Sequence, residues 1–338
     1  MRLTAPREKG WLARAIDAGG EFRNPLEQIE DGLFLTSGER RAKTSQFWVL
    51  LVLASVIAAG GVVSDSTPAV IGAMIIAPLA TPIYGVALAT VIGSRRDLTA
   101  SLALLVAGIT ANILVGFLVG LVTVARVPVE ANPQIVGRTA PTVLDLGVAV
   151  TVGVAGSFAL VRRDVSNILA GVAIAISLVP VLAVVGITLG SGHFDLAWGA
   201  FVLFLTNAAA IIVAGVVVFT AAGYGRVARE RGLHPRRRAK ALIAVFVVVL
   251  LVPLSLASLR TWRYERWVDA SEAAATQWVS GTGWQVESVA QNGGDIVITA
   301  MGPGNAPPID SLRTAVRAKV PRRVEVRVVE DSGKTVAL

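Results

Sequence analysis

The chain has no cysteine and only 2 histidines among its 338 residues. The lack of cysteine excludes disulfides, thiolate metal sites and cysteine nucleophiles. Two histidines, far apart in sequence, also fall short of the three protein ligands that a catalytic zinc site normally needs. Charge is scarce as well: 16% of the residues are Asp, Glu, Lys or Arg, against about 25% in a soluble domain. With 54% hydrophobic residues, the composition indicates an integral membrane protein.

Sequence motifs of enzymes are also missing. The chain has no HExxH, no GxSxG and no glycine-rich phosphate loop after a strand, the motifs of zinc proteases, serine hydrolases and nucleotide-binding proteins. We therefore expect neither an enzyme nor a cofactor. The net charge of +8 does not indicate nucleic-acid binding, because much of the excess lies in short loops beside apolar runs, as membrane topology requires.

Apolar runs of about the length that crosses a bilayer, roughly 20 residues, follow a polar and basic start. There are seven of them, at approximately 46–63, 67–93, 98–125, 142–161, 165–189, 197–222 and 240–259. Lys and Arg fall almost entirely on alternate connections, and the loops of the other side hold only Arg126 and Arg138. Because cytoplasmic loops carry the excess of Lys and Arg, we expect a multi-pass protein of the cell membrane with its N-terminus in the cytoplasm and its C-terminal segment outside.

This topology divides the chain into five parts. They are a basic cytoplasmic segment (1–45), a six-span membrane domain (46–222), a basic cytoplasmic loop (223–240), a seventh transmembrane helix (241–260) and an extracytoplasmic domain (261–338). The predicted fold class is an all-α polytopic membrane bundle of about seven transmembrane helices plus a small C-terminal α+β domain.

The C-terminal part has the pattern of a small α+β domain. Its helical and alternating segments are 265–280, 284–290, 295–301, 309–320 and 322–330, in the order α-β-β-α-β, with a hairpin signal between the first two strands. That order is similar to small lipid- or partner-binding modules of the BON type, although a fold does not by itself give a function.

Residues 64–93 are the run around which the membrane domain is organised. Pro68 fits the first turn of a helix, whereas Pro78 and Pro82 fall inside the run. Each of the latter removes a backbone hydrogen bond and clashes with the preceding turn, so the helix is predicted to break near residues 77–81. Broken backbone is tolerated in a membrane only where protein or water covers it. The alternatives are a transport site inside the bundle and a kinked helix that only packs.

Three motifs follow one another in the apolar region: PAVIGAM with IAPL and Pro82 at 68–82, RTAPTVLDLGVAV at 138–150, and GVAIAISLVPVLAVVGITL with FLTNAAAIIVAG at 171–215. Together they resemble the bacterial and archaeal membrane family called domain of unknown function 389, over roughly residues 45–220. One departure is Pro180-Val181, where the family often has a Pro-Pro pair. The resemblance implies a prokaryotic membrane protein; it implies no activity, since none is established for the family.

The second and fifth runs also resemble each other. Ala and Pro are five residues apart in Ala77–Pro82 and again in Ala175–Pro180, and the next run carries one embedded asparagine in each case, Asn112 and Asn207. Runs one to three and four to six would then be inverted repeats of three helices, a transporter architecture with its site near the midplane. Chance similarity between Ala-, Gly- and Val-rich helices is the alternative.

Polar groups inside the predicted membrane are the candidates for a substrate or ion pathway. Asp145 either pairs with Arg138 or caps its helix, or faces a cavity as a proton or cation ligand; Asp65 either caps the second run or lies on the pathway. The asparagines either join helices by hydrogen bonds or complete a site. The full set of candidates is Asp65, Pro78, Thr81, Pro82, Asn112, Asp145, Ser177, Pro180 and Asn207.

Partners follow from the same pattern. The lipid bilayer is the first, and Arg236, Arg237 and Arg238 are candidates for binding anionic headgroups, although topology alone explains their charge. The GxxxG pairs Gly116/Gly120 and Gly186/Gly190 favour close helix packing inside one chain over a homo-oligomer. No nucleic acid is expected.

Two functions remain open at this point. The first is a transporter or channel-like permease for a small solute or ion, with an anion favoured if helix N-termini face the site and a cation if free carbonyls do. The second is a membrane scaffold or sensor that presents an extracytoplasmic lipid- or protein-binding domain.

Overall fold

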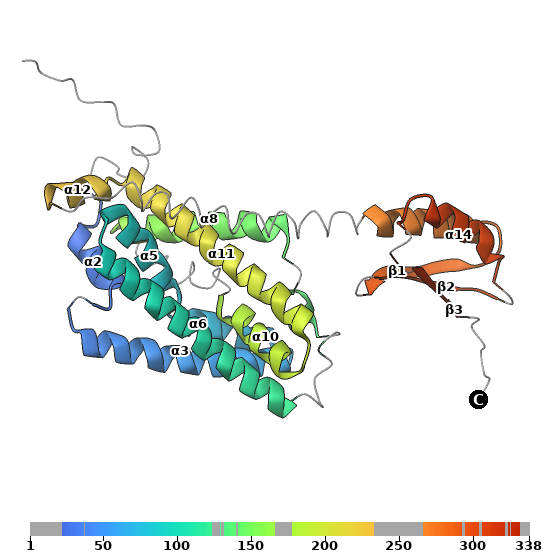
Figure 1. The fold of residues 1–338 in the computed structure, drawn as a ribbon, viewed down its shortest axis with the longest axis horizontal. Coiled ribbons are helices and arrows are strands. Elements are labelled where there is room, and N and C mark those ends of the chain that lie inside the picture. The colour runs from blue at the N-terminus through green and yellow to red at the C-terminus, as the bar shows by residue number, and fades with distance from the viewer. Residues whose placement is uncertain are drawn as a thin grey trace, which may run out of the picture. The chain divides into compact units, whose positions relative to one another are not determined.

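The computed structural model describes residues 22–36, 38–123, 129, 132–139, 141–165, 178–232, 266–292, 295–303, 306–321, 324 and 326–331. The chain divides into two compact units, Met1–Leu254 and Ser255–Leu338. Each unit is considered by itself (Figure 1).

The first unit is helical. Its helices are α2 (Leu26–Leu33), α3 (Arg40–Val63), α4 (Thr67–Ile76), α5 (Ala80–Ile92), α6 (Arg95–Thr123), α7 (Pro133–Val136), α8 (Val143–Val161), α10 (Leu178–Gly190), α11 (Phe194–Ala221) and α12 (Tyr224–Glu230). Within the described residues, α3, α6, α8 and α11 are long and apolar enough to cross a membrane, and α4 with α5 reaches that length as a bent pair. These helices indicate a membrane protein. The predicted helix 241–260 lies outside the described residues, so the expected count of seven stays a prediction.

The predicted break of the second apolar run is confirmed. α4 ends at Ile76, Ala77 is extended (φ −68°, ψ 124°), and α5 continues after a bend of 42°. The cause is in the sequence, because Pro78 has no amide hydrogen to donate to the carbonyl four residues earlier, and Pro82 has none for Pro78. Instead, the Thr81 amide donates to the Pro78 oxygen at 3.1 Å, which forms a tight turn at the start of α5.

Glycines bring α6 and α10 into backbone contact. The buried residues of α6 form one stripe at spacings of three and four: Ser101, Leu105, Gly108, Asn112, Gly116 and Gly120. A Cβ on Gly116 would lie 2.6 Å from the Ala183 oxygen, and one on Gly120 would meet the backbone of Ile187. Both contact positions advance by four residues, so the two helices run parallel. The GxxxG pairs thus pack against each other within one chain, with α10 between α6 and α11 (Figure 1).

An N-terminal clamp holds the ends of distant helices together. The Arg23 guanidinium donates to the Ala222 oxygen at 2.7 Å and the Asn24 amide donates to the Leu160 oxygen at 2.8 Å. The buried Tyr224 hydroxyl donates back to the Asn24 oxygen at 2.8 Å. The chain before α2 therefore satisfies backbone carbonyls at the ends of both α8 and α11, a role that the basic composition of residues 1–45 does not reveal.

The second unit is a small α+β fold. Residues 266–279 are helical, and β1 (Gln285–Asn292), β2 (Asp295–Met301), α14 (Ile309–Arg317) and β3 (Val326–Asp331) follow. The sheet order is β1-β2-β3, with β1 antiparallel and β3 parallel to β2. The order of elements is the predicted one.

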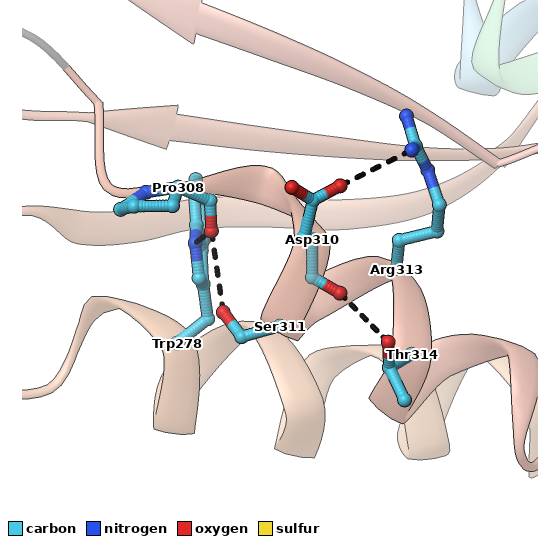
Figure 2. A network of polar contacts seen from close by, with 6 residues as sticks. All are labelled: Trp278, Pro308, Asp310, Ser311, Arg313 and Thr314. Atoms are coloured by element: carbon cyan, nitrogen blue, oxygen red, sulfur yellow. Dashed lines mark hydrogen bonds and ion pairs between the residues drawn. The ribbon is translucent and has the colours of Figure 1, made fainter.

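Two helices of this unit meet at Pro308, where α14 begins. The Trp278 indole donates to the Pro308 oxygen at 3.0 Å and the Ser311 hydroxyl donates to the same oxygen at 3.2 Å (Figure 2). Asp310 accepts from Arg313 and, through its backbone oxygen, from Thr314. The start of α14 is thereby fixed to the preceding helix.

Gly116→Ala is expected to lower the melting temperature of the purified protein in detergent. The added methyl group would press on the Ala183 backbone, and overpacking of this kind costs about 1–3 kcal/mol. Gly60→Ala is the matched control, since it also lies within a long apolar helix and nothing is found within 4 Å of its added Cβ. Equal melting temperatures for the two variants would contradict the close contact of α6 with α10.

Candidate functional site

A cavity of about 280 Å³ opens among α7, α8, α10 and α11. It extends along the first turns of α8 and reaches the first turn of α10 and the middle of α11. The lining is mostly aliphatic and carries three polar side chains, Arg138, Asp145 and Asn207. The lining residues are Gly137, Arg138, Asp145, Val148, Ala149, Val152, Leu178, Val181, Leu203, Asn207 and Ile211.

Asp145 has a clear local role at the start of α8. The Thr142 amide and hydroxyl donate to Oδ2 of Asp145 at 2.8 and 2.7 Å, and the Asp145 amide donates to the Thr142 hydroxyl oxygen at 3.2 Å. These bonds form a capping box. A carboxylate in the first turn is also stabilised by the positive end of the helix dipole. The capping alternative for Asp145 is therefore what the structure shows, while the same residue also lines the cavity.

Arg138 lines the cavity and has no carboxylate partner among the described residues. Its Nη1 donates to the backbone oxygen of Gln134 at 2.7 Å and to Oε1 of the same residue at 3.0 Å. No Asp or Glu of the described chain comes within ion-pair distance of it, so the expected pair with Asp145 is not formed. Partial burial lowers the pKa of the guanidinium, since desolvation disfavours the charged form.

The loop that carries Arg138 is held at several points. The Asn132 amide donates to the Val62 oxygen at 2.9 Å, at the end of α3, and the Gln134 amide donates to the Thr67 hydroxyl at 3.0 Å, at the start of α4. The backbone of Thr139 packs directly on Gly199 of α11, where a Cβ would not fit. Arg138 is therefore placed by three different helices rather than by a free loop.

The two embedded asparagines lie in different surroundings. Asn207 is near the middle of α11, and its Oδ1 is buried without a hydrogen-bond partner at the cavity. Asn112 has an exposed fraction of 0%, and both polar atoms of its amide lack a partner. Asn112 falls on the stripe of α6 between Gly108, which contacts Leu79, and Gly116, which contacts α10. It therefore lies between the broken α4–α5 span and α10, outside the cavity.

The remaining candidates are placed as follows. Asp65 is exposed in the turn before α4 with a left-handed φ of 48°, a conformation that Asp tolerates better than most residues, and the Ser66 N-cap makes no side-chain bond. Pro78 lies in the break, Thr81 and Pro82 in the first turn of α5, and Pro180 between the cavity residues Leu178 and Val181. Ser177 and Arg236, Arg237 and Arg238 lie outside the described residues.

The structure thus brings Asp145 and Asn207 together and adds Arg138, which sequence reasoning treated only as a partner for Asp145. A signal was present, because Arg138 is one of two basic residues in the loops expected outside. A metal site is not indicated in the described part of the chain, where no group of three His, Asp or Glu side chains could hold an ion.

Comparison with known proteins agrees with the sequence motifs. Residues 74–213 match the model of a family described as Domain of unknown function (DUF389). An uncharacterized protein of the archaeon Methanocaldococcus jannaschii is 30% identical over 209 residues, which span 62% of this chain and 64% of that relative. A comparison with solved structures finds no match. The family match confirms the resemblance to domain of unknown function 389, over a segment that runs from Met74 in α4 to Val213 in α11 and includes Asn112 and Asn207.

Proposed function

We propose that the protein is a transporter or channel-like permease for a small solute or ion, rather than an enzyme. The observation that carries this proposal is the cavity with three polar side chains inside a bundle of apolar helices. Asn207 lies 13 residues from the start of α11 and 14 from its end. At about 1.5 Å per residue, the cavity would bring solvent some 20 Å into the span.

An inverted repeat of three helices is part of the proposal, and the pattern of helix contacts supports it. α3 packs on α6 as α8 packs on α11, and α5 packs on α6 as α10 packs on α11. Between the two halves, α10 packs on α6 as α5 packs on α11. These three contacts correspond from one half to the other, which is the pattern expected of a pseudo-two-fold axis.

Glycine positions support the same repeat. Gly120 and Gly215 each follow an embedded asparagine by eight residues. A Cβ on Gly120 would meet Ile187 of α10, and one on Gly215 would lie 2.9 Å from the Cβ of Ala87 of α5. Each asparagine-bearing helix therefore packs, at the same offset, against the helix of the other half that carries a proline as its third residue, Pro180 in α10 and Pro82 in α5. Transporters of this architecture bind their substrates between such helices.

The topology remains part of the proposal. We place the protein in a prokaryotic cell membrane with its N-terminus inside, with α4 and α5 forming one crossing and the second unit outside. Anionic lipids are proposed partners of the basic loop.

A second candidate function is a scaffold or sensor. A groove of about 350 Å³ runs between α14 and β3 of the second unit, and it combines aliphatic residues with Arg313 and Arg317. A groove of this composition suits a lipid or an acidic protein segment, with the helical bundle serving as its anchor.

Flux measurements separate these two functions. The protein would be reconstituted in liposomes, and currents recorded on a solid-supported membrane across a panel of ions and small acids. We expect a saturable signal that Asn112→Leu/Asn207→Leu abolishes and that deletion of residues 268–338 leaves in place. Absence of any saturable signal across the panel, from protein shown to be folded, would favour the scaffold.

Asn112→Leu is expected to fold and to melt at an equal or higher temperature than the unchanged protein. It removes a buried amide whose two polar atoms have no partner, and an unsatisfied buried group costs about 1–3 kcal/mol. Asn132→Leu is the matched control, because Asn132 is also buried but has hydrogen-bond partners. Its side-chain amide donates to the Val62 oxygen, and its Oδ1 accepts from the backbone amide of Gln134. This variant should melt at a lower temperature. A large loss of stability in Asn112→Leu would give Asn112 a structural role instead.

A further inference from the structure

We propose that the cavity lined by Arg138 and Asn207 binds a small anion, and that this anion class is the transported substrate. Only the second part of this inference, that the anion is transported, rests on the proposed transport function. Binding of the anion is a property of the cavity itself and is tested separately.

The charge balance of the cavity carries the inference. Arg138 presents five donors in a rigid fork, and the described chain engages a single nitrogen of it, with two neutral oxygens of Gln134. A guanidinium that is partly withdrawn from water and faces a cavity without a counter-ion attracts an anion from solution. Carboxylates and oxyanions match its planar geometry best, because they accept two parallel hydrogen bonds.

Asp145 does not cancel this charge. Its Oδ2 already accepts two hydrogen bonds from Thr142, and its charge sits at the positive end of α8. The negative charge of Asp145 is therefore balanced locally by the start of α8. In the described chain, no charged group balances the positive charge of Arg138. The cavity keeps a net attraction for anions despite having one carboxylate in its wall.

The deeper end of the cavity has groups that suit the same ligand. Leu178 and Val181 of α10 line it beside Asn207. The amide of Asn207 offers donors as well as an acceptor. With a volume of about 280 Å³, just below the usual range of roughly 300–1,000 Å³ for ligand pockets, the site suits inorganic anions and short carboxylates.

Anion binding would be measured by thermal unfolding of the purified full-length protein in detergent. Sodium chloride, nitrate, formate and acetate would be compared at constant ionic strength against sodium gluconate, the bulkiest anion of the set. A ligand that binds only the folded protein raises its melting temperature in proportion to the logarithm of its concentration. We expect at least one small anion to stabilise the protein with this logarithmic dependence, and Arg138→Gln to raise its dissociation constant at least tenfold.

Two further variants keep this test sharp. Arg138→Lys retains the charge and loses the fork, so it should bind chloride nearly as well as the unchanged protein but bind formate and acetate more weakly. Arg96→Gln removes an exposed arginine remote from the cavity and should change nothing. Equal anion responses of Arg138→Gln and Arg96→Gln would overturn the proposal. It would also be overturned if amino-acid zwitterions were the only ligands that stabilised the protein and if Asp145→Asn abolished that stabilisation.

The flux assay then separates the two halves of the inference. Arg138-dependent binding without flux of any anion would uphold the anion site and contradict transport. Saturable flux of a cation or neutral solute that Arg138→Gln leaves unchanged would uphold transport and overturn the anion inference. Flux of the stabilising anion, weakened in Arg138→Gln and intact in Arg96→Gln, would support both.

Discussion

Backbone hydrogen bonding in an apolar bundle is the constraint on which the membrane unit depends. Pro78 and Pro82 interrupt the second run, which separates α4 from α5 and frees backbone groups near Ala77. Such groups are not tolerated against lipid, so the break has to be covered by other helices. α6 covers it, since a Cβ on Gly108 would lie only 3.0 Å from the side chain of Leu79, so the glycine lets Leu79 pack closely on this helix. Leu79 itself is almost fully buried, at 1% exposed.

Close packing of α6 on α10 follows from the same stripe of small residues and determines the environment of Asn112. Gly116 and Gly120 bring the two backbones together, and Asn112, one turn earlier on the same face, is enclosed with them. A leucine or alanine would satisfy an apolar interface at that position without a polar cost. The asparagine instead leaves two buried polar atoms unpaired, a feature that packing does not require and that native cores generally avoid.

Sequence periodicity and proline positions were enough to predict the broken span, the long apolar helices and the α-β-β-α-β order of the second unit, because each depends on residues close together in the chain. The N-terminal clamp was not predictable in this way. Arg23 donates to the Ala222 oxygen and Asn24 to the Leu160 oxygen. No local sequence pattern predicts a hydrogen bond to a backbone carbonyl more than 100 residues away. The sequence also left open whether Asp145 pairs with Arg138, caps its helix or faces a cavity. Thr142 satisfies the carboxylate first, and a capping box competes well with an ion pair because it fixes only short side chains.

The difference between Asn112 and Asn207 bears on how such a bundle would work. Two halves in identical surroundings would expose both asparagines alike, yet Asn207 lies at a cavity and Asn112 is fully enclosed. Alternating access in transporters with inverted repeats is a movement of one half against the other around a central site, so a single conformation opens one side only. In the proposed transporter, the cavity at Arg138 is then the open side, and the glycine contacts of α6 with α10 close the other.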